Sequence, residues 1–344
     1  MTAIRKHQKA GTMKTSPQLK RLNTEDHSRH RRGARLLPSA VLTTGVTILL
    51  FTLVNGETTV EQPDFCQQTA QAVLTSCRGA AQSDYSLALG KCDNITDSAA
   101  REDCRKQASA DLQDARQTCE EQKGARLAAC GQLGGVRYDP VIDPSNFVAR
   151  IDNPYFPLRP GTTFIYEGQT AQGFEHDEFA VTHHTRVILG VTCVEVHDSV
   201  TVDGELTEDT LDWFAQDRDG NVWYFGENTH ELEDGLITTI DGTFMAGVNG
   251  DKPGIIMKAQ PAIGDFYRQE FSLQNAEDFA ETVSLTASVT VPAGTFHNCL
   301  KSKETTPLET DLLEYKFYAP GVGNVLTVDA RTGDREELVQ IRHQ

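Results

Sequence analysis

Six cysteines between residues 66 and 130 have spacings that read the same in both directions: 11, 15, 12, 15 and 11. Two arms of an antiparallel hairpin bring together residues whose numbers add up to a constant. The cysteines meet this condition in pairs, because each pair sums to 196. The spacing therefore predicts one of the fifteen possible pairings of six cysteines. The predicted disulfides are Cys66–Cys130, Cys77–Cys119 and Cys92–Cys104.

The two arms have the composition of helices. They are rich in Ala, Gln, Glu and Arg, and no proline occurs between Asp64 and Asp139. Residues 93–98 supply the turn, where Asp97 or Ser98 is the expected N-cap of the second helix. Zinc binding is the rival interpretation, but zinc sites bring cysteines in close pairs that this segment lacks. We therefore expect a disulfide-stapled antiparallel α-helical hairpin over residues 60–135.

The tip of this hairpin carries Asn94-Ile95-Thr96, which matches the acceptor pattern for N-glycosylation. Both a glycan and a simple turn role for Asn94 remain open.

The N-terminal region predicts export. Residues 1–35 are basic and have no apolar period, so we expect a disordered tail. Leu36–Val54 contains no charged residue, and nineteen helical residues span about 28 Å, close to the thickness of a bilayer. Residues 36–56 are therefore a signal or transmembrane segment, and the sequence leaves open whether it is cleaved or retained as an apolar helix.

Basic residues before the apolar segment place the N-terminus in the cytoplasm and the rest of the chain outside. Disulfides persist in oxidising compartments outside the cytoplasm, so the cysteines indicate the same side of the membrane. The expected location is periplasmic, cell-surface or secreted, with residues 36–54 as a membrane anchor if they are retained. The net charge of −17 argues against nucleic acid as a partner, because the chain after the basic tail is strongly acidic.

Residues 136–344 have the pattern of an antiparallel β domain. Apolar and polar residues alternate from Thr282 to Val291, as in a strand with one buried and one solvated face. Asp-Gly or Asn-Gly pairs recur between strand-like runs and predict tight hairpin turns, for example at Asp203-Gly204 and Asp234-Gly235. The expected fold is mainly β, a curved antiparallel sheet or a partly closed barrel. Cys193 and Cys299 are predicted to form a fourth disulfide within it, the alternative being two buried free thiols.

Several motifs in this domain carry a resemblance. Residues 151–227, with Asn153-Pro154-Tyr155-Phe156-Pro157-Leu158 and Gly220 to Glu227, resemble a group of exported bacterial proteins of unassigned function. Val291 to Phe296 and Tyr318 to Gly323 are similar to segments of LolA-like, unclosed-barrel envelope proteins. The resemblance implies a concave sheet that holds an apolar ligand such as a lipid or an acyl chain. The cysteine hairpin is an addition to that pattern.

Catalytic signatures such as G-x-S-x-G, a P-loop or H-E-x-x-H are absent from the sequence, and we expect no cofactor. His176, His183 and His184 lie among carboxylates and form a candidate metal site, with a solvated strand as the alternative. Trp213, Trp223 and Tyr224 are candidates to line a ligand groove, with core packing as the alternative.

Three functions remain in competition. The leading hypothesis is a non-enzymatic envelope protein whose β domain binds an apolar ligand or a protein partner. The alternatives are a structural or adhesive surface protein and a metal-dependent hydrolase.

Overall fold

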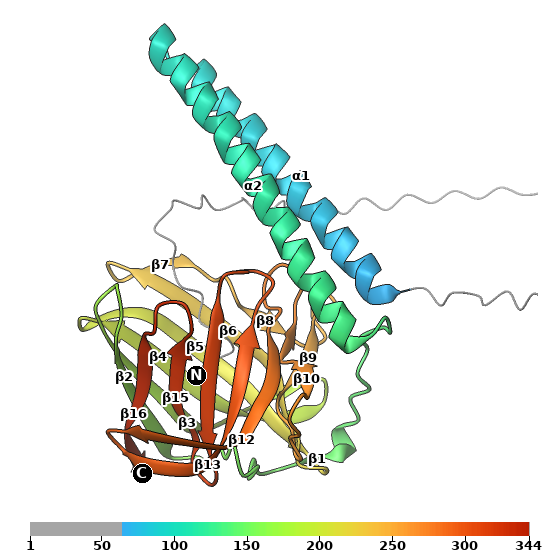
Figure 1. Cartoon of the computed structure of the whole chain (residues 1–344), viewed down its shortest axis with the longest axis vertical. Coiled ribbons are helices and arrows are strands. Elements are labelled where there is room, and N and C mark those ends of the chain that lie inside the picture. The colour runs from blue at the N-terminus through green and yellow to red at the C-terminus, as the bar shows by residue number, and fades with distance from the viewer. Residues whose placement is uncertain (1–63, 344) are drawn as a thin grey trace, which may run out of the picture. The chain divides into compact units, whose positions relative to one another are not determined.

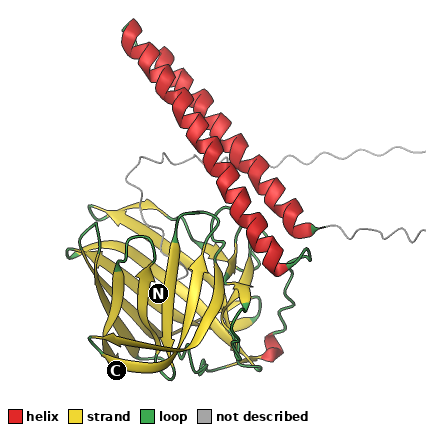
Figure 2. Ribbon diagram, viewed as in Figure 1, coloured by secondary structure: helices red, strands yellow, loops and turns green. Residues whose placement is uncertain are grey.

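A computed structural model describes residues 64–343, which belong to one compact unit. Two antiparallel helices, α1 (Phe65–Asp93) and α2 (Ser98–Leu133), form the predicted hairpin (Figures 1 and 2). Each helix begins at an aspartate that caps it: Asp64 accepts from the backbone N–H of Gln67, and Asp97 from that of Ala100. The candidate signal or anchor at residues 36–56 lies outside the described residues. Among those that are described, no helix is both long and apolar enough to cross a membrane.

The cysteine spacing predicts the staples correctly. Cys66–Cys130, Cys77–Cys119 and Cys92–Cys104 are bonded, with Cα–Cα distances of 5.6, 5.8 and 5.6 Å. Most of the buried side chains of the two helices are small, either alanine or cysteine, so packing alone gives this pair little stability. The disulfides supply what the packing lacks, and they place this part of the protein in an oxidising compartment.

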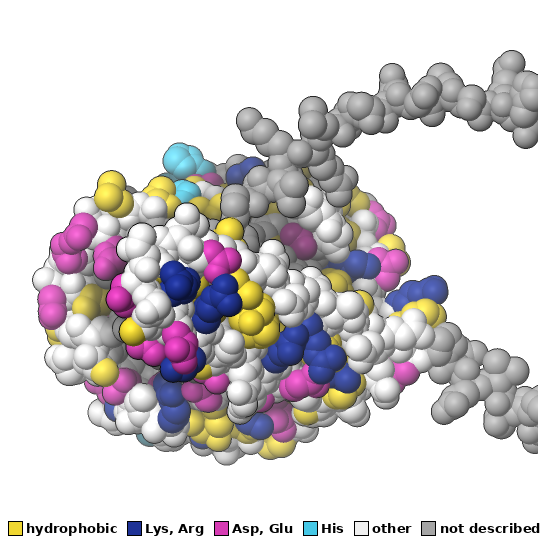
Figure 3. Space-filling model, turned by 90° about the horizontal axis from the view of Figure 1, so that it is seen from above, with side chains coloured by type: hydrophobic (Ala, Val, Ile, Leu, Met, Phe, Trp, Pro, Cys, Tyr) yellow, Lys and Arg dark blue, Asp and Glu magenta, His cyan; other side chains and the backbone are white. Residues whose placement is uncertain are grey.

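The surface of the hairpin carries both signs of charge. Arg78 pairs with Glu120 and Arg105 with Asp93 across the two helices. Figure 3, which views the molecule from above, likewise shows Lys and Arg side chains interspersed with Asp and Glu. Exposed pairs of this kind contribute little to stability, about 0–1 kcal/mol each.

The rest of the described chain is a 16-stranded antiparallel sheet, preceded by a short 3₁₀ helix at Pro144–Asn146. Its main path runs β10-β12-β13-β14-β15-β16-β2-β3-β4-β5-β6-β9-β11, while β1 pairs with β5, and β7 and β8 pair with β6. The strands are β1 Phe147–Val148, β2 Thr162–Gln169, β3 Phe174–Ile188, β4 Val191–Val202, β5 Glu205–Asp217, β6 Val222–Glu233, β7 Leu236–Thr239, β8 Phe244–Met245, β9 Lys252–Met257, β10 Phe266–Arg268, β11 Glu270–Phe271, β12 Phe279–Val291, β13 Gly294–Thr305, β14 Leu313–Ala319, β15 Gly323–Asp329 and β16 Arg335–His343.

The two ends of this sheet meet. β10 pairs with β12 at one end and β11 pairs with β9 at the other, and Gln269 alone separates β10 from β11 in the sequence. The sheet is therefore a nearly closed antiparallel barrel, in agreement with the predicted partly closed barrel (Figure 2). The predicted Asp-Gly turns join neighbouring strands: Asp203-Gly204 links β4 to β5 and Asp234-Gly235 links β6 to β7, all four residues with positive φ.

Two hydrophobic clusters pack on opposite faces of the sheet. The larger fills the barrel interior with side chains from strands all round it, among them Phe164, Phe214 and Leu338. The smaller lies outside β4, β5 and β6 and contains Trp213 and Phe225.

These two clusters explain why the fourth predicted disulfide is wrong. Cys193 belongs to the outer cluster and Cys299 to the inner one, so the wall of the barrel separates them. Both are free, buried thiols. Sequence alternation alone does not tell which face each cysteine occupies, because every strand has an inner and an outer side.

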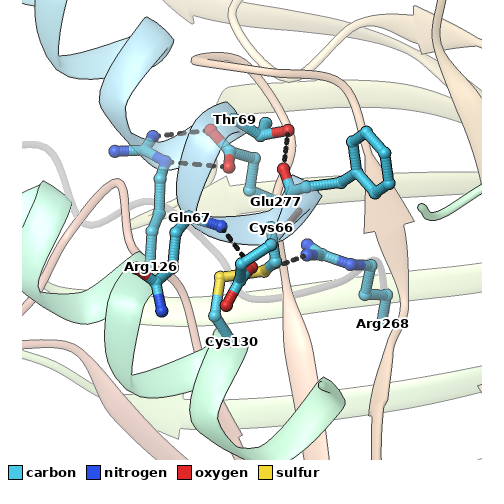
Figure 4. The surroundings of a disulfide bond; sticks show 9 residues. Cys66, Gln67, Thr69, Arg126, Cys130, Arg268 and Glu277 are labelled. Carbon is cyan, nitrogen blue, oxygen red and sulfur yellow. Dashed lines mark hydrogen bonds and ion pairs between the residues drawn. A yellow bond between two sulfur atoms is a disulfide. The ribbon is translucent and has the colours of Figure 1, made fainter. Parts of the chain in front are cut away.

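The base of the hairpin is fixed to the barrel by a buried ion pair (Figure 4). The guanidinium of Arg126 in α2 donates to both carboxylate oxygens of Glu277, which precedes β12, over 3.0 and 2.6 Å. Both side chains are almost fully buried. Nearby, Gln122 donates to the carbonyl of Leu308, and Arg268 lies 3.7 Å from the sulfur of Cys66. The hairpin is thus attached next to its Cys66–Cys130 staple.

Candidate cation-binding pocket

The aromatic residues predicted to line a groove do not share one. Trp213 is buried in the outer cluster, where the Arg186 guanidinium lies 4.3 Å from its ring and Glu195 accepts from its Nε1. Trp223 packs against the same outer cluster, whereas Tyr224 points inward and stacks on Phe214 at 4.7 Å. Core packing therefore accounts for all three side chains.

The candidate metal site is not assembled either. His176 lies 3.2 Å from Glu167, and His184 lies 3.4 Å from Glu195 farther along β3. Between them the ladder of β3 and β4 shifts register, so that His183 and His184 fall in an irregular stretch outside the regular pairing. Within residues 64–343, no three His, Cys, Asp or Glu side chains come close enough to hold a metal ion.

A pocket opens instead at one end of the barrel, and it is acidic. Its volume is about 120 Å³. Seven carboxylate side chains line it, together with one guanidinium, that of Arg335, which also pairs with Glu337. The carboxylates come from the ends of strands and from the β15–β16 turn: Glu175, Glu208, Glu231, Glu314, Asp329, Asp334 and Glu336.

Carboxylates oppose one another directly across strand pairs at this end of the barrel. Glu208 of β5 is the cross-strand partner of Glu231 of β6, and four residues further along β5 Asp212 faces Glu227. On the other wall, Glu314 of β14 faces Asp329 of β15. Like charges placed directly opposite destabilise a sheet. Three such pairs on inward-facing positions concentrate carboxyl groups at this end of the barrel.

A bulge in β6 creates two of these pairs. Tyr224 pairs with Phe214, but the next register position joins Gly226 to Trp213, so β6 has one extra residue there. As a result Glu227 and Glu231 point inward, although simple alternation would place them outside. Gly226 is required at this point: its φ is +151°, and a Cβ atom would lie 2.5 Å from the carbonyl oxygen of Phe244.

Below the pocket, the interior carries further buried acids. The hydroxyl of Tyr224 donates to Oδ1 of Asp212, a fully buried residue. Burial, as the largest cause, and the nearby charge of Asp198 together raise the pKa of Asp212 to about 8. Asp177 on β3 is buried on the same inner face. The wall formed by β3 to β6 is therefore rich in carboxyl groups at several depths.

On the opposite wall, a buried lysine partly neutralises the charge of two carboxylates. The ammonium of Lys316 lies 3.1 Å from Glu304 and 3.6 Å from Glu314. Burial lowers the pKa of Lys316, but these two carboxylates outweigh it and hold the pKa above its ordinary value. The Tyr318 hydroxyl donates to Glu304 and completes the network. This cluster shows that the interior accommodates an ammonium group among carboxylates.

Comparisons with known proteins leave the family open. A scan against protein-family models finds no match, and a search of curated proteins finds none either. Among solved structures, a candidate lipoprotein from Parabacteroides distasonis is similar to this chain at 16% sequence identity, with a TM-score of 0.31. The match covers 55% of this chain and 98% of that one. Similarity at this level carries no argument about function, and the resemblance to LolA-like proteins remains a prediction.

Proposed function

We propose that this chain is an exported binding protein that holds an organic polycation in the acidic mouth of its barrel. The observation that carries the proposal is the gathering of seven carboxylate side chains around one pocket at the end of the barrel. A surface with so many carboxylates attracts cations, and this attraction is stronger in a partly buried pocket than in bulk water.

The distribution of the carboxylates favours an extended ligand. Glu208 and Glu231 lie on the β5–β6 wall, Glu314 and Asp329 on the β14–β15 wall, and four strands separate the two walls along the sheet. Both walls line the same pocket. A molecule with several ammonium groups contacts both walls at once, whereas the described residues do not converge on a single point as metal ligands do.

The packing of the interior disfavours the apolar ligand that the family resemblance implies. Away from the mouth, the inside of the barrel is filled by aromatic and aliphatic side chains of the protein itself. The space at the mouth is bordered mainly by charged and hydroxyl groups. We therefore place the ligand at the mouth and assign it a positive charge. Residues 36–54, as a signal or an anchor, deliver this binding site to the far side of the membrane.

Isothermal titration calorimetry of the full-length protein with spermidine tests the proposal. Binding is expected to weaken steadily as the salt concentration rises from about 0.05 to 0.5 M, because salt screens the carboxylates. The double variant Glu208→Gln/Glu231→Gln is expected to lose about tenfold in affinity. The matched control removes two exposed carboxylates from the hairpin, Glu102→Gln/Asp103→Asn, and leaves binding unchanged. Absence of binding, or equal affinity in both double variants, would overturn the proposal.

A further inference from the structure

The three disulfides of the hairpin lie in different electrostatic surroundings. In order along α1, they are the base staple (Cys66–Cys130), the middle staple (Cys77–Cys119) and the tip staple (Cys92–Cys104). Beside the middle and tip staples, exposed arginines are each paired with a carboxylate of the other helix. The two ion pairs are Arg78–Glu120 and Arg105–Asp93. Their charges cancel in pairs and solvent screens them, so neither staple lies in a strong field.

The base staple lies beside an arginine that, within residues 64–343, forms no ion pair with a carboxylate (Figure 4). This residue is Arg268 of β10, and its Nη2 is 3.7 Å from Sγ of Cys66. The ring centres of Tyr138, Phe271 and Phe279 lie 5.5, 5.2 and 5.0 Å from its Cζ atom. These rings exclude solvent from the guanidinium, so its charge acts on the sulfur with less screening than at the surface.

The two sulfurs of the base staple lie at opposite kinds of helix end. Cys66 is in the first turn of α1, where the helix dipole is positive, and Cys130 is in the last turn of α2, where it is negative. A thiolate is therefore stabilised at Cys66, by the helix and by Arg268, and disfavoured at Cys130. The carboxylate of Glu277 nearby is already neutralised by Arg126.

We propose that the base staple is a thiol–disulfide exchange site for an external dithiol, and that it is the most readily reduced of the three staples. A thiolate of the dithiol attacks Sγ of Cys130, the S–S bond breaks, and Cys66 leaves as a thiolate beside Arg268. The second thiol of the reductant then attacks the mixed disulfide and releases Cys130. Two electrons pass to the protein, the dithiol becomes a disulfide, and its two protons go to Cys130 and to solvent. Stabilising the departing thiolate favours both the rate and the extent of this reduction.

Reduction at this position leaves the hairpin assembled. The middle and tip staples still join the two helices, and the buried ion pair of Arg126 and Glu277 still fixes the base to the barrel. The exchange is therefore reversible without unfolding. It goes beyond the proposed function, because the acidic pocket takes no part in it.

Equilibration of the full-length protein with mixtures of reduced and oxidised dithiothreitol at about pH 7 tests the proposal. Equilibrium is approached from the oxidised and from the reduced side, and free thiols are trapped with acid and labelled with N-ethylmaleimide in urea. Cys130, Cys119 and Cys92 lie in separate tryptic peptides, so mass spectrometry reads each staple separately. We expect Cys130 to be labelled at a ratio of reduced to oxidised dithiothreitol about tenfold lower than Cys119 or Cys92, which corresponds to a thiolate stabilised by about one pKa unit.

Arg268→Gln is expected to raise the ratio needed to reduce the base staple about tenfold, whereas Arg268→Lys keeps the charge and should stay within about threefold of the wild type. The matched control, Arg105→Gln, removes the arginine beside the tip staple and should change the ratio for that staple by less than about twofold. Equal ratios for the three staples in the wild-type protein, or a base staple that is reduced last, would overturn the inference. An effect of Arg105→Gln as large as that of Arg268→Gln would do the same. If Arg268→Gln fails to fold, the wild-type order and Arg268→Lys still decide the question.

Discussion

Neutralising one member of an opposed carboxylate pair should make the protein more stable. In Glu231→Gln, the amide oxygen still accepts hydrogen bonds, but the charge that faces Glu208 across the strands is gone. Like-charged cross-strand neighbours cost about 0.2–1 kcal/mol. Both residues are half-buried, which reduces screening by solvent, so the upper part of that range applies. We expect the free energy of unfolding to rise by about 0.5–1 kcal/mol.

Urea denaturation followed by tryptophan fluorescence measures this change, because both tryptophans of the chain lie on β5 and β6. The slope of the transition should stay constant while its midpoint rises. Glu233→Gln on the same strand is the matched control: Glu233 is exposed and faces Leu236, so its stability should change by less than about 0.5 kcal/mol. A loss of stability in Glu231→Gln, or an equal gain in the control, would refute the argument that these carboxylates repel one another.

Three further predictions concern other parts of the described chain. Glu277→Gln weakens the buried ion pair at the base of the hairpin and should lower the free energy of unfolding by about 3 kcal/mol, whereas the apolar pair Arg126→Met/Glu277→Leu should recover most of it in urea denaturation. Because the pKa of Asp212 is raised to about 8, its carboxyl keeps a proton in the native state between about pH 4 and pH 8, where the unfolded chain has already released it. The free energy of unfolding should therefore fall as the pH rises through this range. In Asp212→Asn, chemical denaturation at several pH values should show a weaker pH dependence and a higher stability at about pH 8. Iodoacetamide should leave the native protein unlabelled, because burial raises the pKa of both Cys193 and Cys299, and mass spectrometry should find two labels after unfolding without reductant and eight after reduction.

The hairpin could be predicted in detail because the sequence features that define it all lie within one continuous segment of the chain. A constant sum of cysteine positions and the absence of proline are sufficient to define two antiparallel helices and three disulfides. The barrel could be predicted only as a class. Alternation and Asp-Gly turns indicate antiparallel strands, but they do not say which strands meet when the sheet closes. The closure depends on residues 266–271 pairing with β12 on one side and with β9 on the other.

The acidic pocket could not be predicted from the sequence, because its carboxylates occupy strand positions that sequence alternation assigns to the solvent face. A polar residue in an alternating strand is ordinarily assigned to the solvent face, yet Glu208 and Asp212 share the inner face with Phe214. In β6, the bulge at Phe225 and Gly226 exchanges the two faces partway along the strand. One available signal was Gly226 within an otherwise aromatic run, because an isolated glycine in a strand indicates a bulge.

A crystal structure of the full-length protein grown with spermidine tests the central claim most directly. The account predicts ammonium nitrogens inside the mouth of the barrel, about 2.7–2.9 Å from carboxylate oxygens of Glu208 or Glu231 on one wall and of Glu314 or Asp329 on the other. Spermidine bound only on the outer surface, or a mouth left empty at saturating spermidine, would contradict it.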